Sequence, residues 1–244
     1  MSENYARNYI DLPFEAVLRQ YRKRNFFEQL ERYAHSRFLE IGCGADPFFK
    51  YMDDTELTVA VEPEELFFEN IKLMADKRSD IVLYNDLIEN LPEDLKMNSF
   101  NYIVIGGFLH EALNPHLVLQ KVRNLCQSDT MVYSYVPNAR SFHRLLAHKM
   151  GLIDDIYQKS GHDKLFDRQI VHDMETYNNL FTSNGFEVID SGSYFVKPFT
   201  HKQMLALLKY KIIDDTCLDG LYKMTDLLPD MGAELWNICK VNDL

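Results

Sequence analysis

Short apolar runs alternate with amphipathic stretches through the central part of the chain. Strands are predicted where these runs are uninterrupted, at Arg37–Ile41, Leu57–Glu62, Asp80–Tyr84, Tyr102–Gly106 and Thr130–Val136. Between them, apolar residues recur at helical spacing, which predicts helices at Pro47–Asp53, Glu64–Ala75 and Pro115–Cys126. A repeated strand and helix order of this kind favours a parallel sheet with helices on both faces.

Further elements follow a polar, histidine-rich segment that begins after Val136. The pattern predicts a helix at Gln169–Asn184 that ends at Gly185, and then a strand at Phe186–Ile189. The run Glu234–Val241 follows a tight turn, so we expect it to join the sheet edge as an antiparallel strand. The predicted fold class is α/β, with a seven-stranded, mostly parallel sheet, an antiparallel last strand, helices on both faces and helical cap segments.

Length and composition limit the domain organisation. The 244 residues, 46% of them hydrophobic, suit one large domain with caps. We expect an N-terminal helical arm at residues 1–35 and a main domain at residues 36–244. The main domain is expected to carry a cap at residues 137–168 and a helical insertion at residues 202–228.

Charge and cysteine content argue against several classes of partner. Lys and Arg number 26 against 37 Asp and Glu, a net charge of −11, which disfavours a nucleic-acid partner. No apolar run reaches the length of a membrane span, and the opening residues lack the apolar core of a signal peptide. The four cysteines have no paired spacing, so we expect a reduced, cytoplasmic protein without a membrane partner.

The most informative segment is the predicted strand that leads into Gly42 and Gly44. Glycine permits positive φ and a close approach of the backbone to a ligand. Eighteen residues after Gly44, Glu62 ends the next predicted strand, where a carboxylate can accept hydrogen bonds from two ribose hydroxyls. The two features together predict a ligand that contains a nucleoside.

Two neighbouring residues bear on the identity of this ligand. Pro47 stands where a dinucleotide-binding fingerprint would need its third glycine. Glu40 precedes the first glycine, and its carboxylate would repel a phosphate but attract an ammonium or sulfonium group. The pattern therefore favours S-adenosylmethionine over NAD.

The segment Leu39–Gly44 resembles motif I of the class I S-adenosylmethionine-dependent methyltransferases. Three further segments agree: Asn85–Leu87 is similar to the adenine-binding step, Gly106–Pro115 to the segment after strand four, and Asn184–Phe186 to the turn into strand six. The resemblance implies a Rossmann-like fold and S-adenosyl-L-methionine as the cofactor, which becomes S-adenosyl-L-homocysteine.

The resemblance also implies roles for individual residues. It places Glu40, Gly42 and Gly44 along the methionine part of the cofactor, Glu62 on the ribose, Asp86 and Leu87 on the adenine, and Gly106 beneath the sulfonium. The sequence departs from the family pattern twice, because Asp46 replaces a frequent third glycine and the common Glu-His pair is inverted as His110-Glu111.

Three histidines are candidate catalytic residues. His110 follows the fourth predicted strand, and His143 and His162 follow the fifth, at the strand ends where open α/β sheets bind ligands. A histidine could act as the base for a hydroxyl acceptor. The other five histidines, His35, His116, His148, His172 and His201, are expected to be structural. No metal site is expected, because Asn114 breaks the H-E-x-x-H spacing and no cysteine cluster is present.

The segment after the fifth predicted strand bears on the acceptor. Val136–Arg144 resembles a bacterial subgroup associated with sugar, polysaccharide or secondary-metabolite methylation. Residues 138–168 carry six Lys or Arg against four Asp, which suits an anionic acceptor. We expect methyl transfer to oxygen or nitrogen of a small polar acceptor, a saccharide or nucleotide-linked sugar. The alternatives are a protein or RNA methyltransferase and a non-catalytic S-adenosylmethionine-binding module.

Overall fold

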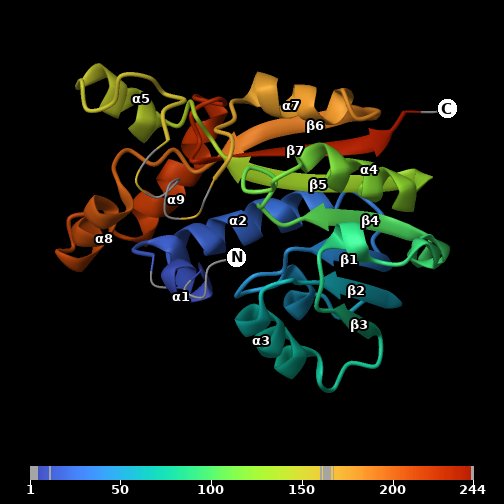
Figure 1. Ribbon diagram of the computed structural model, residues 1–244. Coiled ribbons are helices and arrows are strands. Elements are labelled where there is room, and N and C mark those ends of the chain that lie inside the picture. Colours follow the sequence, from blue (N-terminus) through green and yellow to red (C-terminus); the bar gives the residue numbers. More distant parts are fainter. Residues whose placement is uncertain (1–4, 11, 160, 162–165, 167, 243–244) are drawn as a thin grey trace.

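The computed structural model describes residues 5–10, 12–159, 161, 166 and 168–242 (Figure 1). Its central feature is a seven-stranded sheet in the order β3-β2-β1-β4-β5-β7-β6. The strands are β1 (Arg37–Ile41), β2 (Leu57–Val61), β3 (Ile81–Tyr84), β4 (Phe100–Ile105), β5 (Cys126–Pro137), β6 (Phe186–Tyr194) and β7 (Glu234–Val241). Strands β1 to β5 are parallel, and β7 is antiparallel to both of its neighbours. The predicted fold class is confirmed.

The position of the last strand differs from the prediction. β7 does not lie at the sheet edge: it pairs with β5 through Tyr133↔Ile238 and with β6 through Ser191↔Asn237. The physical reason lies in its residues, because Glu234 to Cys239 are all buried, as expected of a strand covered on both sides and both faces. The edge strand is β6, which extends to Tyr194, beyond the predicted end at Ile189.

Helices cover both faces of the sheet. They are α1 (Tyr5–Ile10), α2 (Glu15–Leu30), α3 (Glu65–Ala75), α4 (Pro115–Leu125), α5 (Phe142–Lys149), α7 (Met174–Thr182), α8 (His201–Lys209) and α9 (Asp215–Lys223). Alternate strand residues point to opposite faces, so Phe38 packs in a core with α2 and α9 whereas Leu39 packs in a core with α4 and α7. Each core therefore consists of the side chains on one face of the sheet and the helix residues that pack on them.

Three predicted helices have different bounds. Only a short 3₁₀ turn, Phe48–Tyr51, forms within Pro47–Asp53. The helix predicted at Gln169–Asn184 begins at Met174, because the side chain of Asp173 caps its first turn. Residues 202–228 form two helices and a 3₁₀ turn, Met224–Asp226, since α8 ends at Lys209 and the side chain of Asp214 caps the first turn of α9. Two more 3₁₀ turns lie at Ile88–Asn90 and Glu93–Asn98.

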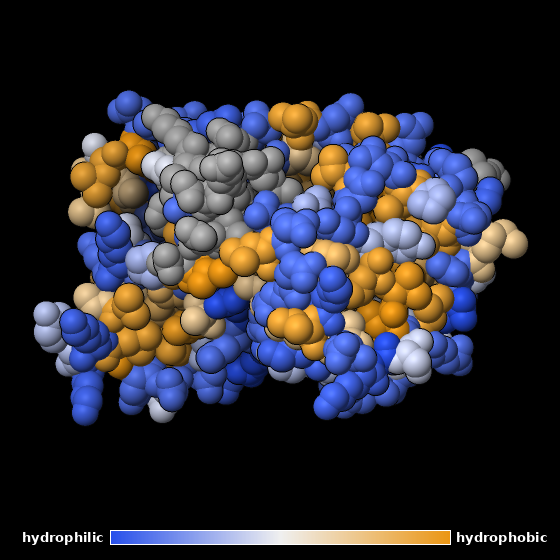
Figure 2. All heavy atoms as spheres, turned by 60° about the horizontal axis from the view of Figure 1, so that its bottom comes forward, coloured by the Kyte–Doolittle hydropathy of each residue, from blue (hydrophilic) through white to orange (hydrophobic). Residues whose placement is uncertain are grey.

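Helices α1, α5 and α8 gather at the end of the sheet where the parallel strands end (Figure 1). On the face shown in Figure 2, hydrophobic residues form separate patches between hydrophilic ones. None of the helices in the described part of the chain is long and apolar enough to cross a membrane.

Candidate active site

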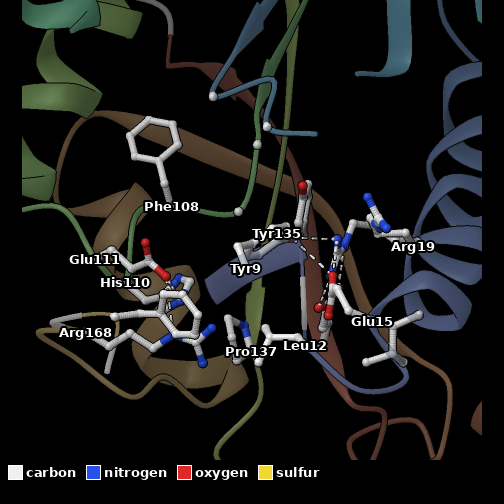
Figure 3. A pocket seen from close by; sticks show the side chains of 18 of the residues that line it. Tyr9, Leu12, Glu15, Arg19, Phe108, His110, Glu111, Tyr135, Pro137 and Arg168 are labelled. Carbon is white, nitrogen blue, oxygen red and sulfur yellow. Dashed lines mark hydrogen bonds and ion pairs between the residues drawn. The ribbon is translucent and has the colours of Figure 1, made fainter. Parts of the chain in front are cut away.

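A cavity of about 970 Å³ lies at the carboxyl ends of the parallel strands. One end is lined by the glycine loop after β1 and by residues that follow β2 and β3. The other end is enclosed by α1, α2, α5, the start of α8 and the start of β7 (Figure 3). The volume is at the upper end of the range for small-molecule sites, and the place is where open α/β sheets bind ligands.

The glycine loop approaches the end of β4 closely. Gly42 and Gly44 have φ of 77° and 58°, values that favour glycine. The backbone N–H of Gly106 donates to the carbonyl oxygen of Ile41 at 2.7 Å, and a Cβ added at Gly106 would lie 2.2 Å from the carbonyl oxygen of Gly42. Glycine is therefore required at position 106 by the packing of two backbones.

Glu40 anchors the turn that follows the glycine loop. Its carboxylate accepts the backbone N–H groups of Phe48 and Phe49 at 2.8 and 3.0 Å, and these are donors that the first turn of a helix leaves without a partner. Burial raises the pKa of Glu40 to about 8, against the opposing effect of the two N–H groups. Glu40 lines the cavity, but both oxygens are engaged by the protein's own backbone.

Glu62 joins the end of β2 to the glycine loop. Its Oε2 accepts the backbone N–H of Gly44 at 2.8 Å, and its Oε1 accepts that of Glu64 at 2.9 Å. Burial raises the pKa of Glu62, and the backbone N–H groups oppose this effect. The carboxylate thus borders the cavity beside the loop, as the sequence predicts for a ribose-binding acid.

Asp46, at the position of the missing third glycine, ties the loop to helix α2. Its Oδ2 accepts from Nζ of Lys23 at 3.0 Å, and its Oδ1 accepts from the hydroxyl of Tyr51 at 2.8 Å. Burial alone would raise the pKa of Asp46, but the hydrogen bonds from Tyr51 and Lys23 lower it. The departure from the family pattern therefore gives the loop an anchor on the N-terminal arm.

Asp86 and Leu87 lie after β3 and line the same end of the cavity. Oδ1 of Asp86 accepts the side-chain amide of Asn90 and the backbone N–H of Leu87, both at 2.7 Å. These bonds lower the pKa of Asp86, with the Asn90 bond as the larger cause. Leu87 is half exposed and lines the cavity with Asp86, the place in which the sequence predicts contacts with adenine.

The opposite end of the cavity holds a buried charge cluster, which we define as Tyr9, Glu15, Arg22 and Glu234. Nε of Arg22 donates to Glu234 at 2.9 Å, and Nη1 donates to Glu15 at 3.1 Å. The hydroxyl of Tyr9 also donates to Glu15, at 3.1 Å. The Arg22 guanidinium lowers the pKa of Glu234 although burial alone would raise it. Figure 3 shows Tyr9 and Glu15 of this cluster near Tyr135, which also lines the cavity.

His110 and Glu111 form a second polar group at the cavity. Nε2 of His110 lies 3.3 Å from Oε1 of Glu111, and Nε of Arg168 donates to the same oxygen at 3.3 Å (Figure 3). The pair sits on a tight turn after Gly107, whose φ is 72° and whose Cβ would meet the ring of Tyr135 at 2.4 Å.

Comparison with known proteins shows the family to which the chain belongs. A family model described as "Methyltransferase domain" matches residues 14–191, which is more than half of the chain. The chain belongs to this methyltransferase family. Among curated proteins, no sequence matches it significantly.

Solved structures share the fold at low identity. N-methyltransferase NodS from Bradyrhizobium japonicum WM9, in complex with S-adenosyl-L-homocysteine, is 12% identical with a TM-score of 0.57, over 96% of this chain and 90% of NodS. An S-adenosylmethionine-dependent methyltransferase from Mesorhizobium loti is 14% identical with a TM-score of 0.58, over 84% and 90% of the two chains. A chain from the complex that contains the Haloferax volcanii Trm112 methyltransferase activator is 11% identical with a TM-score of 0.66, over 100% of both chains.

S-adenosyl-L-methionine is the cofactor of the methyltransferase, and the strand ends fit it. Gly42 and Gly44 present bare backbone to the cavity. The carboxylate of Glu62 offers about four lone-pair sites, of which two backbone N–H groups use one each, so acceptor capacity remains for ribose hydroxyls. The predicted roles toward the cofactor stay predictions for all of these residues: Glu40, Gly42, Gly44, Glu62, Asp86, Leu87 and Gly106.

The predicted catalytic histidines have different positions. His110 and His143 both line the cavity, whereas His162 lies outside the described residues. Burial lowers the pKa of His143 well below its usual value, and the nearby basic groups Lys197, His201 and Arg144 reinforce this effect. Within the described ranges, no group of three or more His, Cys, Asp or Glu could hold a metal ion.

Sequence reasoning missed several cavity residues. The pairing of Arg22 with Glu234 joins residues 212 positions apart, and Lys197 and His201 reach the cavity from the segment after β6. Two signals were present: Glu234 is a charged residue that opens an apolar strand, and Glu15 and Arg22 lie seven apart on one helix face.

The cap residue Arg144 donates its guanidinium N–H groups to the carbonyl oxygens of Ile156 and Gln158, so it holds the cap together.

Proposed function

We propose that the methyltransferase transfers the methyl group of S-adenosyl-L-methionine to an oxygen or nitrogen of a small polar acceptor, a saccharide or nucleotide-linked sugar. One observation carries the proposal: a single cavity joins the glycine loop and Glu62 to the buried charge cluster. The N-terminal arm and the caps enclose the acceptor end, which suits a small molecule.

The chemical character of the acceptor end supports a sugar. Carboxylates of Glu15 and Glu234 and the guanidinium of Arg22 can exchange hydrogen bonds with hydroxyl or amino groups. The rings of Tyr9 and Tyr135 offer flat apolar surfaces beside these groups. Such a mixture of a few fixed polar groups with aromatic walls orients a polar ligand.

The protein's part in catalysis would be alignment and exclusion of water. The bound cofactor supplies a methyl group activated by a sulfonium. Gly42, Gly44 and Glu62 would hold it at the strand ends, and the arm would hold the acceptor opposite, so that the attacking atom lies in line with the bond that breaks. His110 and His143 line the cavity and stay candidate bases.

A product assay tests the proposal. The methyltransferase is incubated with S-adenosyl-L-methionine and, separately, glucosamine, UDP-glucosamine, a tRNA pool and a peptide pool, and S-adenosyl-L-homocysteine and methylated product are measured by mass spectrometry. We expect product with at least one of the two sugars. Product only with RNA or peptides would contradict the sugar class, and cofactor binding without any product would favour a non-catalytic module.

A further inference from the structure

Lys197 is a buried amine in the wall of the cavity, and the alignment mechanism above does not use it. Its side chain belongs to the segment that follows β6, the residue is only 3% exposed, and it lines the same cavity end as Glu234 and His143. Within the part of the chain that the structure describes, Nζ of Lys197 forms no hydrogen bond or ion pair. An ammonium buried in this way is costly, which favours the neutral amine.

Charged groups face this amine from several elements. They are Glu15 on α2, Glu234 on β7, Arg168 before α7 and His143 on α5, while Arg22 and His201 line the same cavity. Burial lowers the pKa of Lys197 to about 7, Glu15 and Glu234 raise it in part, and Arg168 lowers it further. At neutral pH the amine is therefore ready to accept a proton.

The carboxylates of the charge cluster can balance one more positive charge than Arg22 supplies. Glu15 and Glu234 carry two negative charges, and Arg22, which pairs with both, carries one positive charge. When Lys197 is neutral, Glu15, Glu234, Arg22 and Lys197 together carry a net charge of −1. A proton that arrives at Nζ makes the group neutral, so these fixed carboxylates stabilise the charge where it develops.

His143 is the weaker proton acceptor of the two. Burial lowers the pKa of His143, the neighbouring basic groups Lys197, His201 and Arg144 act in the same direction, and no carboxylate is among the causes that act on it. For Lys197, by contrast, two carboxylates oppose the effect of burial.

We propose that Nζ of Lys197 accepts the proton that the attacking oxygen or nitrogen of the acceptor loses during methyl transfer. This inference rests on the proposed function. The attacking atom forms a bond to the methyl carbon with a lone pair, and the carbon–sulfur bond breaks with its electron pair left on sulfur. The proton of the attacking atom passes to the lone pair of Nζ. The positive charge that sulfur loses is thus recovered on Lys197, near Glu15 and Glu234.

The first test needs no acceptor. The titration of Lys197 is followed by NMR of methyltransferase labelled with ¹³C at lysine Cε, and its resonance is assigned by its loss in Lys197→Met and its persistence in Lys209→Met, an exposed lysine at the end of α8. We expect this resonance to titrate near neutral pH. Titration above pH 9 would overturn the inference, whichever acceptor the protein uses.

The second test is turnover with the sugar that gives product. We expect Lys197→Met and Lys197→Arg to lower kcat by on the order of 10²- to 10⁴-fold, since neither side chain can accept a proton, with cofactor affinity by calorimetry within about threefold of the wild type. In the wild type, kcat/KM should rise with pH through the value found by NMR, and Lys209→Met should follow the same profile.

The outcomes of the two tests separate the two proposals. Wild-type turnover by Lys197→Arg, whose guanidinium stays protonated, would exclude proton acceptance at this position. A wild-type protein that gives no product with either sugar contradicts the acceptor class, whereas the NMR titration still supports or overturns the assignment of Lys197.

Discussion

Replacing Glu40 by glutamine is expected to change the pH dependence of stability. Glu40 is 2% exposed, and burial raises its pKa from 4.5 to about 8. Between these values the folded state binds more protons than the unfolded state. The stability from this group is therefore complete below pH 4.5 and is lost as the pH rises through 8. The slope is about 1.4 kcal/mol per pH unit and the total is roughly 5 kcal/mol.

The assay is urea unfolding of the wild type and Glu40→Gln at pH 5, 6, 7 and 8. Glutamine can accept only one of the two N–H groups of Phe48 and Phe49, which costs the variant about 1–3 kcal/mol independently of pH. The wild type loses more than this as the pH rises toward 8, so its stability advantage should shrink and then reverse. A difference that stays constant from pH 5 to pH 8 would refute the reasoning.

Asp80→Asn is the matched control for this experiment. A hydrogen bond from Arg78 is the largest of the effects that lower the pKa of Asp80 to about 2. Its folded pKa is depressed, so the stability it provides is lost only as the pH falls toward 2. The difference between the wild type and this variant should therefore be flat over the range in which Glu40→Gln shows a slope.

Three further predictions concern packing, charge and cofactor. Arg22→Met leaves two buried carboxylates without their partner and should lower the unfolding free energy by about 3–5 kcal/mol in urea, whereas the more exposed Arg24→Met on the same helix should cost under about 1 kcal/mol. Gly106→Ala should lower the melting temperature through a cost of about 1–3 kcal/mol or more, while Gly220→Ala, which meets no atom within 4 Å, should be neutral or stabilising; equal effects would contradict the close approach. Glu62→Gln should weaken binding of S-adenosyl-L-homocysteine by roughly 10- to 100-fold in calorimetry, and an unchanged affinity would remove the ribose assignment.

Local signals in the sequence account for most of the fold. β1 and β7 have the same bounds as the predicted strands, because each is rich in apolar residues and is bounded by polar or turn residues. The position of β7 inside the sheet depends on pairing with β5 and β6, which lie far from each other in the sequence. The helix predicted from Pro47 is only a 3₁₀ turn, Phe48–Tyr51, whose first N–H groups are capped by Glu40 from the end of β1, a contact that the local pattern does not reveal.

The position of the glycine loop and of Glu62 at the cavity could be predicted because these residues follow their strands directly. Gly42, Gly44 and Glu62 carry their signal in residue type and in spacing from an apolar run. The acceptor end could not be predicted, since Arg22 meets Glu234 only after the whole sheet has formed. A charge buried by such a distant contact looks in the sequence like any surface charge.

Two adjacent residues of α2 serve the two ends of the cavity. Arg22 holds Glu15 and Glu234 at the acceptor end, and Lys23 holds Asp46 in the glycine loop. A small displacement of this one helical turn would therefore move Asp46 in the glycine loop together with Glu15 and Glu234. We therefore expect changes of acceptor preference that act through α2 to alter cofactor affinity as well, and changes in α5 or at the start of α8, which line the cavity without a bond to the glycine loop among the described residues, to alter acceptor choice alone.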